Sequence, residues 1–97
     1  MAIKQQSGKL SVLRVHKKGT GYGPPGDLID VEVVVKFKNS STQAYGFQLR
    51  PGDLLPAHEG MLELLRDAFM NDMKATIDYD ENPGKENHLL FRVWLER

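Results

Sequence analysis

The residue types that most often carry catalysis or bind metals are few and scattered in this chain. Its three histidines, His16, His58 and His88, lie far apart, and no two have the spacing with which a helix places two imidazoles on one metal. There is no cysteine, which excludes thiolate ligands and thiol nucleophiles. The Gly-x-Ser-x-Gly turn of many serine hydrolases is also absent. The sequence therefore predicts no catalytic residue, no metal site and no cofactor.

One acidic cluster, formed by Asp78, Asp80 and Glu81, invites a chemical interpretation. Asp78 and Asp80 fall on the same face of a predicted strand, where two carboxylates can act as an acid–base pair or bind a hard cation. A solvated strand face that ends in an acidic turn explains the same pattern, and we favour it. We expect the protein not to be an enzyme.

Residues 17–27 contain four glycines and two adjacent prolines, a composition that excludes regular structure. The alternating glycines resemble a phosphate-binding loop. That motif, however, needs a helix directly after the glycines, and here Pro24 and Pro25 are followed by a predicted strand. We expect a long hairpin loop that exposes Lys17, Lys18 and Tyr22.

Composition and charge indicate one globular domain. The chain has 97 residues, of which 40% are hydrophobic and 27% are charged. The formal net charge is zero, but residues 1–50 carry eight basic and three acidic residues, whereas residues 51–97 carry five and ten. If these halves separate in space, the molecule has a positive and a negative end, which favours head-to-tail contact between copies. The alternative is that both sets of charges coat solvated faces.

The start of the chain lacks the apolar run of a signal peptide, and no segment approaches the length of a membrane span. We expect a cytoplasmic protein with no membrane partner, unless a leader has been removed. Residues 1–8 are polar and are expected to form a flexible N-terminus, with a single domain over residues 9–97.

The clearest structural pattern is the alternation of residues 28–38. This period of two, carried largely by β-branched residues, predicts a long central strand. Residues 9–16 predict the first strand, whose alternation changes phase after Val12, as in a β-bulge. Residues 43–50 predict the third strand, in which Gly46 is unfavourable unless a neighbour packs closely. The shared face of the central strand consists of Ile29, Val31, Val33, Val35 and Phe37.

Apolar residues at steps of three and four predict a helix over about residues 59–71. Leu64 and Met70 lie at the edges of its apolar stripe, where they either widen the stripe or face a partner. Residues 74–80 and 88–96 predict the last two strands, joined by a turn of typical composition. The helix stripe consists of Met61, Leu62, Leu65, Ala68, Phe69 and Met73.

Alternation in the last strand predicts an interface. It places Leu90 and Trp94 on the face opposite the expected core, as an exposed apolar pair. Exposed aromatic side chains often mark subunit contacts. The alternative is that Trp94 packs under the helix or the N-terminal residues. The residues expected inside are Leu89, Phe91, Val93 and Leu95.

Three strands, a helix and two strands, with a bent first strand, are the element order of the OB-fold, a five-stranded Greek-key barrel. An α+β fold, in which one curved antiparallel sheet is covered by the helix, is the alternative. Within OB-folds the chain resembles the compact barrels of AB5-toxin B subunits and small uncharacterised bacterial proteins of that shape. The resemblance rests on element order, the long second strand and the helix near residues 59–71. It implies a five-membered ring that binds glycans, but the chain lacks the signal and cysteines typical of those subunits.

The sequence thus supports two functional hypotheses. The first is a non-catalytic binding or assembly module that forms a homo-oligomer, for example a ring, through Leu90 and Trp94. The second is the binding of single-stranded nucleic acid or an oligosaccharide in the OB groove, where basic and aromatic side chains recognise such ligands. The ligand-binding candidates are Lys17, Lys18, Tyr22, Lys36, Lys38 and Arg50.

Overall fold

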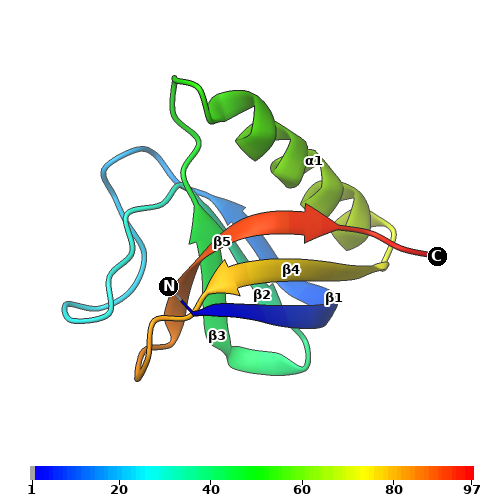
Figure 1. Cartoon of the computed structure of the whole chain (residues 1–97), viewed down its shortest axis with the longest axis horizontal. Coiled ribbons are helices and arrows are strands. Elements are labelled where there is room, and N and C mark those ends of the chain that lie inside the picture. The colour runs from blue at the N-terminus through cyan, green and yellow to red at the C-terminus, as the bar shows by residue number, and fades with distance from the viewer. Residues whose placement is uncertain (1) are drawn as a thin grey trace.

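The computed structural model describes residues 2–97 and contains five strands and one helix (Figure 1). The bounds are β1 Ile3–Val15, β2 Val33–Phe37, β3 Ser40–Phe47, α1 Leu55–Met70, β4 Lys74–Asp80 and β5 Asn87–Trp94. The strands pair in the order β1-β2-β3-β5-β4, and β4 pairs again with β1, so the sheet closes into a barrel. This closed barrel with one helix confirms the predicted fold class, is compatible with an OB-like barrel, and excludes the open-sheet alternative.

Strand β1 is long because it pairs with two neighbours in the closed barrel. Residues 3–9 pair antiparallel with β4, and residues 10–15 pair antiparallel with β2. The predicted bulge is present, but it falls between Leu10 and Val12. The prediction that this strand starts at Lys9 is wrong, since it starts at Ile3. Residues 3–8 are held by backbone hydrogen bonds to β4, which the polar side chains of this segment do not indicate. Met1, the first residue of the expected flexible N-terminus, lies outside the described residues.

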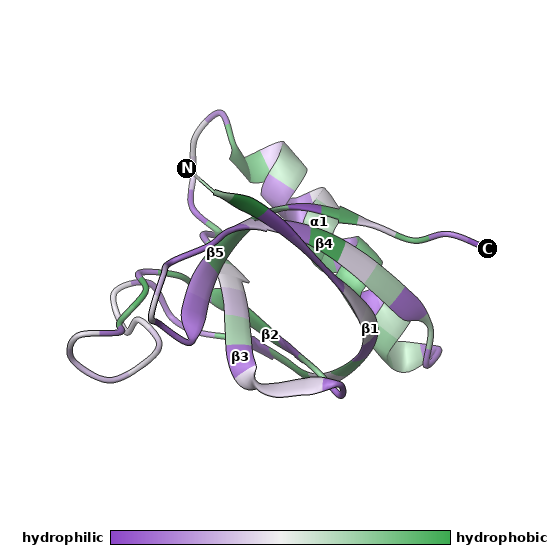
Figure 2. Cartoon of the chain, turned by 60° about the horizontal axis from the view of Figure 1, so that its bottom comes forward, coloured by the Kyte–Doolittle hydropathy of each residue, from purple (hydrophilic) through white to green (hydrophobic). Residues whose placement is uncertain are grey.

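The main core fills the barrel and extends under α1. Figure 2 shows the five strands arranged around this interior, with α1 lying against one side. The helix contributes Met61, Leu65 and Ala68, and it packs against β1, β5 and β4. The core residues from β2 and β3 are Val33, Val35, Phe37, Tyr45 and Phe47.

Helix α1 begins four residues before the predicted Glu59, at Leu55. Pro56 occupies its first turn, where the fixed φ angle of proline suits a helix and its missing N–H leaves no bond unmade. The apolar stripe is confirmed only in part, because Phe69 is exposed. Met70, predicted at the edge of the stripe, is also exposed, so the last turn of the helix presents two large apolar side chains to solvent.

The predicted long central strand is wrong in its length. Only Val33–Phe37 pair as β2, and before them Ile29 forms an isolated bridge with Tyr22. Ile29 and Val31 belong to a second apolar cluster with Val34, separate from the main core. An extended segment that buries alternate side chains has the same pattern as a paired strand, so periodicity could not locate where pairing starts.

Gly46 allows this second cluster to lie against β3. A Cβ atom on Gly46 would be 2.7 Å from both Val31 Cγ2 and the backbone oxygen of Val33. The close neighbour that the sequence required at this glycine is therefore Val31, with the backbone of β2 behind it.

We expect Gly46→Ala to lower the free energy of unfolding by about 1–3 kcal/mol, because the added methyl group must displace backbone in a packed site. Urea denaturation followed by circular dichroism measures the change. Gly60→Ala is the matched control: nothing lies within 4 Å of its added Cβ, and it should stabilise α1 by up to about 1 kcal/mol. Equal stability of the Gly46→Ala variant and the wild type would show that the contact is not tight in solution.

Candidate functional site

A cleft of about 510 Å³ opens on the outside of the barrel where β3 and β5 diverge. The two strands are parallel neighbours over residues 44–46 and 87–89, and their pairing ends there. His58, from the first turns of α1, lines the cleft beside the divergent strands, with its ring centroid 5.4 Å from that of Phe47. The remaining lining residues are Leu28, Ile29, Asp30, Gly46, Gln48, Asp80, Leu89, Leu90 and Phe91.

A bulge in β5 determines which apolar side chains face this cleft. Tyr79 pairs with Leu90 and Asp78 pairs with Arg92, so Phe91 is an extra residue without a partner opposite. One extra residue reverses the faces of the residues around it. Leu90 is therefore buried in the core, whereas Leu89 and Phe91 remain 49% and 38% exposed. The predicted inward positions of Leu89 and Phe91 are wrong, and so is the predicted exposure of Leu90.

Two smaller hollows extend the cleft at its ends. One shares Asp80 and Leu89 with it and reaches the β4–β5 turn. The other shares His58 with it and reaches the segment between β3 and α1, where Leu54 is exposed. Because each hollow shares lining residues with the cleft, we refer to the cleft and the two hollows together as the groove.

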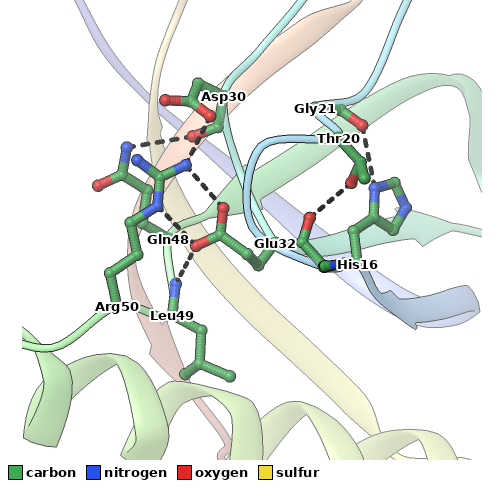
Figure 3. A network of polar contacts seen from close by, with 9 residues as sticks. His16, Thr20, Gly21, Asp30, Glu32, Gln48, Leu49 and Arg50 are labelled. Carbon is green, nitrogen blue, oxygen red and sulfur yellow. Dashed lines mark hydrogen bonds and ion pairs between the residues drawn. The ribbon is translucent and has the colours of Figure 1, made fainter.

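An ion-pair network holds one wall of the groove. Arg50 donates to both oxygens of the buried Glu32 carboxylate, at 2.9 and 2.7 Å, and also to Asp30 (Figure 3). The backbone N–H of Leu49 donates to Glu32 as well, at 2.9 Å. These hydrogen bonds from Arg50 lower the pKa of Glu32 and of Asp30 below their usual values. Arg50 is thus committed to two carboxylates and is not a free cation for an anionic ligand.

A second set of hydrogen bonds joins the β1–β2 loop to the β4–β5 turn. The Asp27 carboxylate accepts from the backbone N–H groups of Glu86 and Asn87, and the Asn87 side chain donates to the Asp27 backbone oxygen. Gly23 lets these segments meet, because a Cβ there would be 2.3 Å from that same oxygen and its φ of 107° suits glycine. These contacts hold the β4–β5 turn, whose Asn87 lines one of the two hollows.

His88 is buried beneath this turn. Its Nδ1 accepts from the backbone N–H of Asn82 at 3.0 Å, so Nε2 carries the proton and donates to Gln43 at 2.6 Å. The rings of Tyr45 and Tyr79, whose centroids are 4.7 Å apart, pack against the His88 ring at centroid distances of 5.7 and 5.1 Å. Burial lowers the pKa of His88, which favours the neutral ring that these hydrogen bonds require.

The predicted ligand-binding residues do not form one site. Lys17 and Lys18 are exposed on the β1–β2 loop. Lys38 lies beyond the far end of β2, where it pairs with Asp72 at 3.6 Å. Six residues of extended chain, or about 20 Å, separate Lys38 from Glu32, the partner of Arg50. The basic candidates are thus divided between two ends of the barrel.

The remaining candidates, Tyr22, Lys36 and Trp94, are half-buried. Tyr22 packs against the second apolar cluster, with the Arg14 guanidinium 5.5 Å from its ring centroid. Lys36, like Tyr22, is half-buried rather than free. Trp94 is half-buried on the outer face of β5, where its indole N–H donates to Glu96 at 2.7 Å. None of these three residues lines the cleft.

Sequence reasoning missed Leu89, Phe91 and His58 as groove residues. For Leu28 the sequence did indicate exposure, because the alternation of residues 28–38 placed it on the outward face, and the structure shows it exposed. No comparable signal marks Phe91, because a bulge depends on the pairing of two strands. Among residues 2–97, no group of three or more His, Asp or Glu side chains is placed to hold a metal ion.

The comparisons with known proteins give no relative: no family model, curated protein or solved structure matches this chain. The resemblance to AB5-toxin B subunits therefore has no support beyond the shared barrel architecture with one helix. Within residues 2–97, no helix has the length and apolar character needed to cross a bilayer.

We expect Arg50→Met to destabilise the fold strongly, because it leaves the buried Glu32 carboxylate with the Leu49 N–H as its remaining partner. The urea midpoint of Arg50→Met should fall several-fold more than that of Asp30→Asn, because Asp30 is a partner of Arg50 whose side chain is 65% exposed. The double variant Glu32→Gln, Arg50→Met should recover much of the loss. A single variant as stable as Asp30→Asn would contradict this role for Arg50.

His88 should make stability depend on pH. Its folded pKa lies below the unfolded value of about 6.5, so the unfolded chain binds the proton more readily and stability falls as pH drops below 6.5. The shifted carboxylates contribute only below about pH 4.5, which leaves the window from pH 7 to 5 for His88. Urea denaturation at several pH values across that window should show that the free energy of unfolding of His88→Asn changes less with pH than that of the wild type. An equal pH dependence in the two proteins would refute the assignment to His88.

Proposed function

We propose that this protein is a non-catalytic binding and assembly module, which associates with further copies of itself through the groove. The observation that carries this proposal is the clustering of exposed apolar side chains around one concave surface. Contiguous apolar patches of this kind mark protein–protein contacts in soluble proteins. The exposed residues that border the groove are Leu28, Leu54, Leu89 and Phe91.

The charge of the groove favours a protein partner over a nucleic acid. The described residues that line the cleft include the carboxylates of Asp30 and Asp80 but no lysine or arginine. Phosphate backbones bind through free cationic side chains, and Arg50 at the edge of the groove is already paired. The alternative of nucleic-acid or oligosaccharide binding also lacks an aromatic platform, since Phe91 is the one exposed aromatic side chain in the lining.

A second copy is the occupant that the chain itself offers. Phe69 and Met70 are uncovered at the end of α1, so contact between copies removes apolar surface from water on both sides. The proposed contact replaces the predicted one, because Leu90 belongs to the core and Trp94 lies away from the groove. A ring is one closed form of such an assembly.

We expect size-exclusion chromatography with light scattering to give a multimer for the wild type and a monomer for Leu89→Asp, which places a charge in the apolar groove. Circular dichroism would confirm that the variant is folded, as expected for a side chain that is 49% exposed. Trp94→Ala is the matched comparison and should remain multimeric. A wild type that is monomeric at millimolar concentration, or a multimer dispersed by Trp94→Ala and not by Leu89→Asp, would overturn the proposal.

A further inference from the structure

We infer that the surface received by the groove is the C-terminal end of α1 of the next copy, so that the copies associate head to tail. This inference rests on the proposed function and names the partner surface of the same site. Phe69 and Met70 form the α1-end patch, and they are 42% and 73% exposed.

The backbone that carries the α1-end patch is anchored, although the two side chains are exposed. Leu65 and Ala68 on the same helix are buried in the core and fix its orientation. Asn71 caps the helix after its last residue: its backbone N–H and side-chain amide both donate to the Asp67 carbonyl, at 3.1 and 2.9 Å. The backbone that carries the patch is already ordered, so binding need not order it, and the unbranched side chain of Met70 adapts to an irregular cleft.

The charges around the two surfaces are complementary. The cleft and its two hollows are lined by four carboxylates and one guanidinium, a formal charge of −3 with histidine neutral: Asp30, Asp53, Asp80, Glu81 and Arg50. Just beyond the α1-end patch, Lys9 and Lys38 both pair with Asp72, at 2.9 and 3.6 Å, and these three residues carry a formal charge of +1. Opposite potentials steer the two surfaces together and disfavour contact between two grooves or two patches.

The groove and the patch lie at opposite ends of the same helix. His58 lines the groove near the start of α1, and Met70 is its last residue, so the helix separates them by about 18 Å. Figure 1 shows the β1–β2 loop and the β4–β5 turn on one side of the molecule and the end of α1 on the other. A copy cannot fill its own groove, and each contact leaves one groove and one patch free. Such heterologous contacts close into a ring or continue as a chain.

A complementation experiment tests this arrangement. Leu89→Asp removes the groove and keeps the patch, whereas Met70→Asp removes the patch and keeps the groove; both residues are exposed, so both variants should fold. Light scattering should show each variant alone as a monomer and their equimolar mixture as a dimer that grows no further. Met70→Leu, which keeps an apolar side chain, should assemble like the wild type.

Each other outcome has a definite meaning. If Leu89→Asp is monomeric but Met70→Asp assembles like the wild type, the groove binds another surface, so this inference fails while the proposed function stands. If both variants are monomeric and their mixture is too, the contact is not head to tail and the inference fails. If the wild type is monomeric, or if Leu89→Asp still assembles, the proposed function fails together with the inference.

Discussion

The parallel pairing of β3 with β5 is the constraint on which the rest of the structure depends. It joins only residues 44–46 to residues 87–89, yet it closes the barrel and brings together strands that lie far apart in the chain. Beyond Gly46 and Leu89 the strands diverge, and the Phe91 bulge re-aims the side chains of β5. The same junction therefore encloses the core on one side and opens an apolar groove on the other.

The loops that form the groove are fixed by polar contacts rather than by regular structure. Arg50 ties the end of β3 to the segment before β2, and Asp27 ties the β1–β2 loop to the β4–β5 turn. Buried polar groups require such partners, and these partners come from segments distant in sequence. A groove with fixed loops can bind a partner without first ordering them, which supports the proposal that this surface is a binding site.

The charge distribution on the folded protein also depends on contacts between segments that are distant in the sequence. The basic and acidic halves of the sequence do not form two ends of the molecule, because β1 pairs with β4 and β3 pairs with β5 across the two halves. In the folded chain, carboxylates line the groove, whereas Lys9 and Lys38 meet at Asp72 just after α1. Head-to-tail contact between copies thus remains a hypothesis, but it now rests on the residues of the groove and of the α1 end rather than on the two halves of the sequence.

The sequence by itself determined the element order, the bounds of β4, the existence of the bulge in β1 and the need for a close neighbour at Gly46. These features are local, since alternation, turn composition and helical spacing are set by residues near one another. Only the tertiary structure decided that Leu90 is core, that Phe91 faces the groove and that Arg50 is paired. Each of these depends on which strand or segment lies opposite, and one unmatched residue in a pair reverses inside and outside.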